Sequence, residues 1–477
     1  MMPQLPPGPK GFPILGYLPY LGSDLHQNFM ELAQVYGPIY KLSIGRKQCV
    51  IISSPSLAKE VLRDQDITFA NRNPSIASLA FSFGGNDIAF ASYGPQWRLL
   101  RKIFVREMLS NENLDAFYPL RRNELKKSVR DVYSKVDTPV NISELAFLTV
   151  INMITSMFWG GSLDDNEDDE TCTLRAEFRA AVSQLVSLLG KPNISDFFPF
   201  LAWMDVQRVE RNMKKVSRWL EQIFEFVIAQ KRNSCEVISS NKDFLQVLLD
   251  FKDPDTGRSI STTEMKAMLM DIVIGGTDTT STMVEWTMTE LVKHPESLRK
   301  CQEELSEVVG NENNVEESHL ANLIYLHAAV KETLRLHPAA PLLLPRSPTK
   351  SSIVGGYVIP KGTKVFVNAW AIHRDPQFWA SPTEFRPERF LDESKLDYHG
   401  NNLHYIPFGA GRSICAGLPL GEKMLMQLLA MLLHLFEWKL PSGAKIDSRE
   451  KLGVVLEKST PLVLVPKPRL PNINIYN

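Results

Sequence analysis

The sequence predicts a mainly α fold with a smaller β region, and three observations support this prediction. The middle of the chain, from about Leu120 to Glu307, has helical periodicity over most of its length. One helix within it, from Ser261 to about Lys293, is long enough to cross a whole domain. Short strand-like runs occur in the first and last thirds of the chain.

The composition indicates an ordinary globular protein. The 477 residues carry 53 Lys and Arg against 54 Asp and Glu, so we expect no nucleic-acid partner. The five cysteines lack the close spacing of zinc or iron–sulfur sites, and such a sparse, odd set favours a reducing compartment. They are Cys49, Cys172, Cys235, Cys301 and Cys415. The sequence contains no uninterrupted apolar run of about 18 residues, so it predicts no transmembrane helix.

The first segment, MMPQLPPGPKGFPILG, is rich in proline and glycine. We expect residues 1–16 to form a rigid hinge before a single domain that spans residues 17–477. No charged and then apolar signal sequence precedes this hinge. Because a hinge connects two parts, we expect an upstream segment in the native protein.

The first third combines the strand-like runs PIYKLSIG and CVIISS with helices. One of these helices, GPQWRLLRKIF, places Trp97 and Arg101 four residues apart, so that their side chains point the same way. An indole N–H beside a guanidinium suits a carboxylate at a partly buried edge. The alternative is an amphipathic helix whose basic residues face water.

The long helix begins at a capping box, Ser261 to Glu264, and ends at His294-Pro295. Roughly 32 residues at 1.5 Å each give a length of about 48 Å. Its centre reads IGGTDTTST, where Gly275 and Gly276 each cost about 1 kcal/mol relative to alanine. Such a centre indicates that something approaches the backbone closely, although a crowded helix crossing would also explain it.

A later helix, NLIYLHAAVKETLRLHP, stops before Pro338 and carries Glu332 and Arg335 on one face. Alone, such a pair is most often a surface ion pair worth well under 1 kcal/mol. The downstream segment FRPERF offers Arg389 as a third member. The run GGYVIPKGTKVFVNAWAIH then predicts strands and turns.

The segment PFGAGRSICAGLPLG places Cys415 in a glycine-rich loop that leads into an apolar helical pattern. Most lone cysteines are small buried hydrophobic residues, so this pattern alone does not make Cys415 functional. A stripe of leucine and methionine predicts that the following helix lies in the core. The stripe consists of Leu420, Met424, Leu425, Leu428, Leu429, Leu432 and Leu433.

Together and in this order, the segments PPGPKG, WRLLR, GGTDTT, ETLR, PERF and FGAGRSICAG resemble the cytochrome P450 family of haem-thiolate monooxygenases. Each short motif except the last is weak, but their joint occurrence is very specific and extends over nearly the whole chain. The resemblance implies the fold of that family. Haem b would lie between the long distal helix and the helix after the cysteine loop.

The resemblance makes Cys415 the axial thiolate ligand of the haem iron, which favours O–O bond cleavage. Glycines let the loop pass close under the macrocycle, and the following helix N-terminus favours the thiolate. Asp278 and Thr279 match the family's acid–alcohol pair, which relays protons to bound oxygen. Gly275 and Gly276 would leave room above the iron.

Further positions match residues that hold the cofactor and the fold in the family. Glu332, Arg335 and Arg389 match its buried structural triad. The other cofactor-binding positions, most of them at the propionates, are Trp97, Arg101, Arg346, Arg72 and Phe408.

One position departs from the family pattern. Plant members usually have a second arginine after the one at Arg412, and this arginine reaches a propionate, whereas this chain has Ser413. Adjacent residues of an extended loop point to different sides, so we do not expect Arg412 to replace it. We expect the other cationic positions or water to hold that propionate.

The substrate pocket would be formed by the family's variable regions. From these regions we expect Phe81, Phe83, Phe198, Ile274, Leu342, Ser459 and Thr460 to line it. This lining suits a compact, mostly apolar molecule. A flavonoid-like phenolic would use the aromatic walls and a polar tip, whereas a sesquiterpenoid would need only apolar shape, and we favour the flavonoid.

The resemblance implies a hydroxylase that uses O₂ and takes electrons from NADPH through the flavins of NADPH–cytochrome P450 reductase. Arg98, Lys102 and Arg106 form the expected basic docking face. The motifs are most similar to plant microsomal members of specialised metabolism, which implies membrane association at the cytosolic face of the endoplasmic reticulum. Without an anchor, we expect this chain to be soluble.

Two alternatives remain at this stage. A haem-thiolate isomerase or dehydratase would act without external electrons, but such enzymes often lack the proton-delivery threonine that this chain has as Thr279. A haem sensor or carrier would bind the cofactor without turnover.

Overall fold

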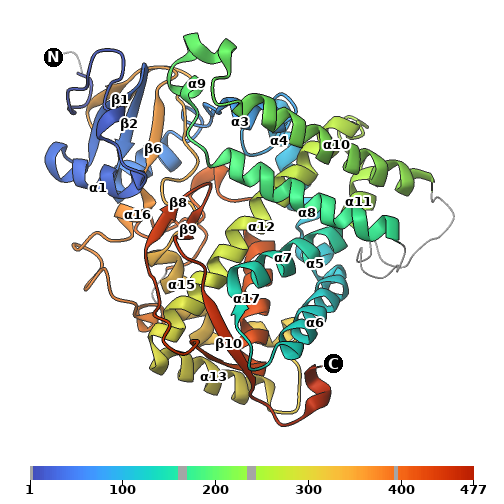
Figure 1. Cartoon of the computed structure of the whole chain (residues 1–477). Coiled ribbons are helices and arrows are strands. Elements are labelled where there is room, and N and C mark those ends of the chain that lie inside the picture. Colours follow the sequence, from blue (N-terminus) through green and yellow to red (C-terminus); the bar gives the residue numbers. More distant parts are fainter. Residues whose placement is uncertain (1–3, 160–168, 234–242, 392–395, 477) are drawn as a thin grey trace.

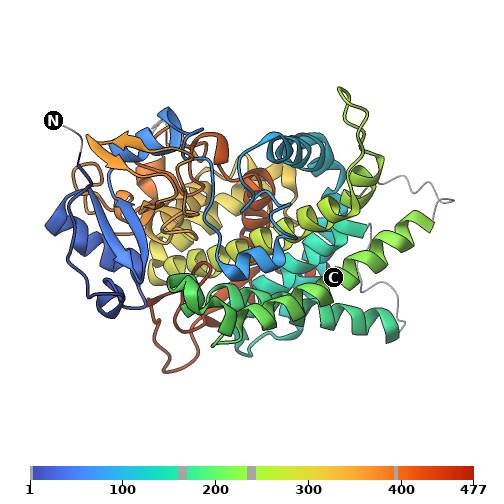
Figure 2. The same cartoon turned by 90° about the horizontal axis from the view of Figure 1, so that it is seen from above.

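The structure is a computed structural model that describes residues 4–159, 169–233, 243–391 and 396–476. Helices form most of the molecule, and the sheet formed by β1 (Ile39–Ile44), β2 (Lys47–Ile52) and β6 (Lys364–Val367) lies at one side, next to the N-terminus, whereas strand β10 (Val463–Pro468) lies near the C-terminus (Figure 1, Figure 2). The predicted mainly α fold with a smaller β region is therefore confirmed.

The helices run throughout the described chain. They are α1 (Leu25–Tyr36), α2 (Pro55–Lys59), α3 (Ile76–Phe81), α4 (Pro95–Ile103), α5 (Asn111–Ala116), α6 (Tyr118–Ser134), α7 (Ile142–Trp159), α8 (Asp169–Leu189), α9 (Ile194–Phe197), α10 (Val209–Asn233), α11 (Phe244–Asp250), α12 (Thr262–Lys293), α13 (Pro295–Val309), α14 (Glu317–Leu320), α15 (Ile324–Leu336), α16 (Ala369–Ile372) and α17 (Leu418–Leu435).

The strands are short and form small sheets. They are β1 (Ile39–Ile44), β2 (Lys47–Ile52), β3 (Val140–Asn141), β4 (Ser352–Val354), β5 (Tyr357–Ile359), β6 (Lys364–Val367), β7 (Phe436–Lys439), β8 (Glu450–Leu452), β9 (Leu456–Lys458) and β10 (Val463–Pro468). The pairings are β1–β2–β6, β3–β10–β7, β4–β5 and β8–β9.

The first sheet joins a strand pair from the first third of the sequence to a strand from the last third. Strand β2 pairs with β1 antiparallel and with β6 parallel, so the predicted strand runs of the first and last thirds share one sheet. The run after β6 was predicted as strands and turns, but it forms helix α16. The reason is a local cap, because the Asn368 side chain accepts a hydrogen bond from the Ala371 N–H at 3.1 Å.

Helix α12 runs through the middle of the molecule and packs against α7, α15 and α17 (Figure 1). Its predicted start is confirmed, because Ser261 and Glu264 form the capping box. Among the described residues, α17 is the helix long and apolar enough to cross a membrane, but 78% of it is buried inside the protein. Helix α17 is therefore a core helix, as its leucine stripe predicted.

The proline-rich segment packs against the edge of β1. The Lys41 N–H donates to the Pro7 carbonyl at 2.8 Å, and the Tyr17 N–H donates to the Ser43 carbonyl at 2.7 Å. A Cβ atom on Gly8 would lie 1.9 Å from the Lys41 carbonyl oxygen, so glycine is required for this approach. The predicted domain boundary at residue 16 stays a prediction.

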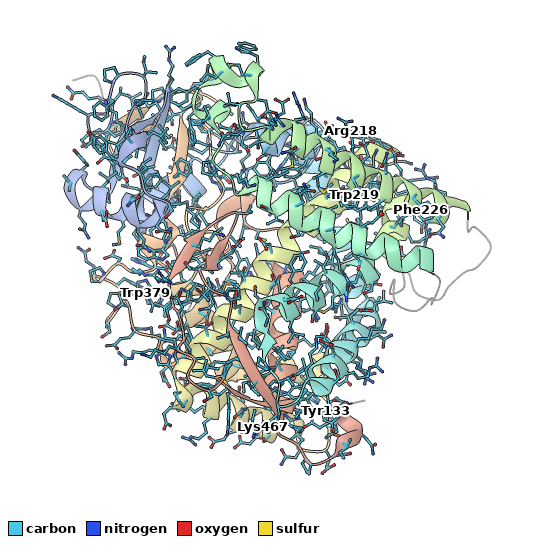
Figure 3. All side chains as sticks on the ribbon, in the orientation of Figure 1. Tyr133, Arg218, Trp219, Phe226, Trp379 and Lys467 are labelled. Carbon is cyan, nitrogen blue, oxygen red and sulfur yellow. The ribbon has the colours of Figure 1, made fainter. Side chains whose placement is uncertain are left out.

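The end of the chain packs on the helical part. Tyr476 stacks on Tyr133 of α6 with ring centroids 4.6 Å apart, and Figure 3 shows Tyr133 close to this end of the chain. The Tyr476 hydroxyl also donates to the Leu435 carbonyl at 2.9 Å. The C-terminal segment thus covers the end of core helix α17.

Candidate functional site

The loop that carries Cys415 is fixed by close backbone contacts. The Cys415 N–H donates to the Phe408 carbonyl at 3.0 Å, which closes the loop on itself. Gly411 has a φ of +70°, and a Cβ atom there would lie 1.9 Å from the Leu62 carbonyl oxygen. Glycine at this position lets the loop lie against the turn after α2. Helix α17 then begins at Leu418, three residues after the cysteine.

The thiol of Cys415 is exposed although the loop lies inside the protein. Burial raises the pKa of the thiol, while the N–H of Gly417, the Arg101 guanidinium and the N–H of Leu418 lower it. A thiol that is surrounded by protein yet exposed faces an interior space. A metal cation in that space would complete the deprotonation, because coordination removes the proton from a thiol.

Helix α12 faces open space at its glycines. Gly275 is exposed, and a Cβ atom there would have no neighbouring atom within 4 Å. A Cβ atom on Gly276 would lie 3.0 Å from the Ile154 side chain, so the second glycine serves helix packing. The helix-crossing interpretation therefore applies to Gly276, whereas a close approach to the backbone at Gly275 stays a prediction.

The cysteine loop, α4, α12 and α17 enclose this space. The Arg101 guanidinium on α4 donates to the Ile414 carbonyl at 2.6 Å, next to Cys415. A Cβ atom on Gly421 of α17 would lie 4.0 Å from the Thr280 hydroxyl of α12. The structure thus brings Cys415 and the centre of α12 to one interior space.

Asp278 and Thr279 lie at the edge of this space. Burial and the nearby Glu457 charge raise the pKa of Asp278 to about 7, and its Oδ2 is buried without a hydrogen-bond partner among the described residues. The Thr279 hydroxyl donates to the Gly275 carbonyl at 2.6 Å. Asp278 can therefore exchange a proton near neutral pH.

Three guanidinium groups gather beside the cysteine loop. Burial and then Arg72 lower the pKa of Arg346 to about 9, and burial and then Arg101 lower the pKa of Arg72 to about 10. Arg346 is 4% exposed, and its Nη1 has no partner among the described residues. The nearby charges of Asp87 and Asp66 oppose these shifts only in part, so a further anion beside the cluster would be stabilised.

The side chains of Trp97 and Arg101 already have partners within the protein. The Trp97 indole donates to the Ile88 carbonyl at 3.0 Å, and the Arg101 guanidinium lies over the indole at 5.5 Å. The role of Trp97 at a propionate thus stays a prediction. Arg412 donates to Asp66 at 2.7 Å and to the Tyr93 hydroxyl at 2.8 Å, so it is already paired, next to Ser413.

The three residues of the predicted triad contact one another near the C-terminal end of α15. Arg335 donates to Glu332 at 2.7 and 2.8 Å, and Arg389 donates to Glu332 at 3.2 Å. Glu332 and Arg335 are both fully buried. The Arg335 guanidinium also lies over the ring of Trp379, labelled in Figure 3, at 5.1 Å. The surface ion pair that sequence alone allowed is thereby excluded.

The predicted pocket residues fall into two groups. Phe81, Phe83, Phe198 and Ile274 are buried or partly buried apolar residues of α3, the loop after it, the segment after α9 and the open face of α12. Phe408 is partly buried and packs edge-on against Tyr398 at 5.5 Å.

The remaining three pocket predictions lie apart from this group. Leu342 packs in the cluster around β1 and β2. Ser459 and Thr460 are exposed, and their hydroxyls donate to the Glu450 carbonyl at 3.0 Å and to the Asp447 carboxylate at 2.9 Å. Ser459 and Thr460 directly follow β9, and their hydroxyls bond to the segment around β8, whereas the charge of Glu457 on β9 raises the pKa of Asp278.

Sequence reasoning missed two carboxyl groups beside the space. Asp271 lies one helical turn before Gly275 on α12, and Asp87 lies in the loop between α3 and α4. The spacing of four residues from Gly275 was the available signal for Asp271. The loop of Asp87 gave no such signal.

Two surface grooves of about 520 and 840 Å³ lie elsewhere and share His337 and Arg374. His337 sits between Glu290 at 3.2 Å and Glu450 at 2.7 Å, and it stacks on Trp286 at 3.9 Å. These polar groups bind one another, so the grooves offer no comparable site. The network joins the ends of α12 and α15 to β8.

The residues at the interior space fit haem. They offer one exposed thiol, a cluster of buried guanidinium groups in which Arg346 Nη1 has no hydrogen-bond partner among the described residues, and a helix face without side chains at Gly275. A thiolate ligand, two carboxylate side groups and a flat macrocycle meet these three requirements. Among the described residues, no group of three or more His, Cys, Asp or Glu could hold a different metal site.

Comparisons with known proteins agree with this fit. The family model described as Cytochrome P450 matches residues 6–465. A flavonoid 3'-monooxygenase of Petunia hybrida is 39% identical over 98% of this chain and 92% of its own length. A flavonoid 3',5'-hydroxylase of Solanum melongena is 37% identical over 99% of this chain and 92% of its own length.

A solved structure, a zebra fish cytochrome P450 with progesterone, has a TM-score of 0.81 and 26% identity, and the match covers 93% of this chain and 99% of that one. The chain therefore belongs to the cytochrome P450 family and is a haem b monooxygenase.

Proposed function

We propose that this protein hydroxylates a flavonoid-like phenolic, inserting one oxygen atom from O₂ with electrons from NADPH. The observation that carries the proposal is the 39% identity, over 98% of the chain, to a flavonoid 3'-monooxygenase. A 3,9-dihydroxypterocarpan 6A-monooxygenase of Glycine max is also 37% identical over 98% of the chain. The aromatic residues beside the open face of α12 suit a planar ring system.

Haem with a thiolate ligand supplies the oxygen chemistry when it is bound. Cys415 would be its axial ligand, and Arg72, Arg101 and Arg346 would hold its propionates. Hydrogen bonds between such charged partners contribute roughly 1.5–3 kcal/mol each. Gly275 keeps the helix face clear on the opposite side of the space.

Asp278 and Thr279 transfer protons in this proposal. Asp278 has a pKa of about 7, so it can hold a proton and release it at neutral pH. The Thr279 hydroxyl donates to the Gly275 carbonyl, which leaves its oxygen free to accept from a water molecule. The pair would thus position water and deliver protons from α12.

The electron donor would be NADPH–cytochrome P450 reductase. Arg98 and Arg106 are exposed on and after α4 and can form part of a basic docking face. Lys102 contributes less, because it already lies 3.8 Å from both Asp253 and Asp255.

Membrane association at the endoplasmic reticulum is supported by an exposed apolar surface. Trp203 is 82% exposed in the segment after α9, and Ile14 is 67% exposed in the hinge. Both segments contact the β1–β2 turn, where the Gly45 N–H donates to the Leu15 carbonyl at 3.1 Å and the Arg46 N–H donates to the Phe197 carbonyl at 3.2 Å (Figure 1). Clustered exposed apolar residues of this kind suit a lipid surface.

The test is turnover by the holoenzyme with the reductase, O₂ and separate panels of flavonoids and sesquiterpenes. We expect a product one oxygen atom heavier from a flavonoid, formed only when NADPH is present. Conversion without NADPH would indicate an isomerase or dehydratase instead. Turnover of sesquiterpenes alone, or haem binding without any turnover, would also contradict the proposal.

A further inference from the structure

Two carboxyl groups lie where α12 meets the loop between α3 and α4, Asp271 on the helix and Asp87 in the loop. The Ile88 N–H donates to Asp271 Oδ2 at 2.6 Å, and the Phe90 N–H donates to Asp87 Oδ2 at 3.1 Å. Asp87 is 1% exposed, and its Oδ1 has no partner among the described residues. The bond to Asp271 holds the loop against α12, whereas the bond to Asp87 lies within the loop and leaves Asp87 Oδ1 without a partner in the described part of the chain.

Asp271 differs from Asp87 because it reaches the interior space. It is partly exposed and lies one turn before Gly275, on the helix face that also carries Ile274 and Asp278. The neighbours of Asp271 on the other faces, Ile272 and Val273, are buried. Asp271 therefore lines the same space as Gly275.

The rest of this part of the lining is aromatic. Phe81 and Phe90 pack edge to face at 5.7 Å, and Phe83 is partly buried beside them. Within such a wall, a polar group sets the orientation of a ligand because it has few competitors. Asp271 is the polar group within this aromatic part of the lining.

Burial disfavours ionisation of both carboxyl groups. Burial and then the Asp87 charge raise the pKa of Asp271 well above its usual value. Burial raises the pKa of Asp87 to about 6, although the Phe90 N–H and Arg72 oppose this rise. Two neighbouring carboxylates in a buried site do not both ionise, so the pair has a hydrogen-bond donor as well as acceptors.

We propose that Asp271, supported by Asp87, is a specificity-determining residue that hydrogen-bonds an oxygen function of the substrate. This inference rests on the proposed function and names the group that selects hydroxylated ring systems. A ligand without the matching oxygen leaves a buried carboxyl group unpaired, and that loss discriminates between ligands more strongly than shape does.

The experiment is a spectral-shift titration of holoenzyme variants with two flavanones, one with a single ring hydroxyl and one without it. We expect the wild type to prefer the hydroxylated flavanone by roughly 3- to 10-fold, the range of one neutral hydrogen bond. Asp271→Asn keeps an acceptor for the Ile88 N–H and a donor for the ligand, so it should keep the preference. Asp271→Leu should bind both flavanones equally.

The control is Glu285→Gln, a change of a buried carboxyl group of α12 that accepts from the Leu462 N–H at 2.7 Å instead of facing the space. It should keep the wild-type preference. The reduced carbon monoxide spectrum verifies intact haem in every variant, and Asp271→Ala replaces Asp271→Leu if the larger change prevents haem binding.

A wild-type preference in Asp271→Leu would overturn the inference and leave Asp271 as a loop contact. Failure of the wild type to bind either flavanone would instead contradict the proposed function. The same variants titrated with an alcohol and a hydrocarbon of one terpene skeleton would then decide the role of Asp271.

Discussion

Replacement of Glu332 by alanine should separate folding from catalysis in this enzyme. The carboxylate accepts two hydrogen bonds from Arg335, one from Arg389 and one from the Arg386 N–H, at 2.7 to 3.2 Å. Arg335 stays fully buried after the change, and its remaining hydrogen bonds go to the uncharged carbonyls of His373, Pro382 and Glu384. Glu332→Ala therefore leaves a buried cation without its counter-charge.

Removal of one partner from a buried ion pair costs about 3–5 kcal/mol. Arg389→Ala removes a longer hydrogen bond to Glu332 and an exposed one to the Ser381 carbonyl from a side chain that is 11% exposed, so its cost should lie near the low end of about 1.5–3 kcal/mol. A chain of 477 residues has an unfolding entropy of about 1 kcal/mol/K. The two variants should therefore melt about 3–5 °C and about 1–3 °C below the wild type.

The assay is thermal unfolding of the holoenzyme at a fixed heating rate, followed by haem absorbance and circular dichroism. The haem content of each purified variant is measured first, because loss of haem should accompany loss of the triad. Equal midpoints for Glu332→Ala and Arg389→Ala would refute the idea that an unpaired Arg335 dominates the cost. Retained turnover per bound haem in Arg389→Ala would confirm that the triad acts through folding.

Four other outcomes are expected. Cys415→Ala should remove the long-wavelength Soret band of the reduced carbon monoxide complex, and an unchanged spectrum would contradict thiolate ligation. Thr279→Ala should lower product formed per NADPH consumed while substrate affinity stays nearly constant; an unchanged ratio would make Thr279 a structural residue. Gly275→Ala should raise stability by up to about 1 kcal/mol with turnover retained, whereas Gly275→Leu should block haem or substrate binding, as titrations would detect. Burial alone would raise the pKa of Glu290, but His337 and Lys293 lower it to about 2, so Glu290 stabilises the fold above about pH 4.5 and loses this effect as the pH falls towards 2; Glu290→Gln should flatten that part of an acid-unfolding curve.

Local signals made much of the fold predictable from the sequence. The capping box at Ser261 and the stop at His294-Pro295 gave both ends of α12, because each signal lies within a few residues of the end it marks. The apolar stripe of α17 predicted a core helix for the same reason. Run 369–372 was not predicted as a helix, because its start depends on one Asn368 hydrogen bond within an otherwise strand-like composition.

Long-range contacts limited what the sequence could give for the site. The bond from the Ile88 N–H to Asp271 joins residues 183 positions apart, and the loop that carries Ile88 has no periodicity to mark its partner. The hydroxyls of Ser459 and Thr460 bond to Glu450 and Asp447, which lie 9 and 13 positions away, and no motif marked these partners. The family motifs supplied Cys415, Asp278 and the triad, but not the surroundings of Asp271.

The repulsion among Arg72, Arg101 and Arg346 has a consequence for the supply of this enzyme in a cell. A chain that folds before its cofactor arrives must hold these cations together with only the partly compensating charges of Asp87 and Asp66, so it gains part of its stability only when the cofactor binds. Marginally stable chains are removed continuously by proteases. The abundance of the enzyme should therefore rise and fall with the availability of haem, independently of how fast its messenger is translated.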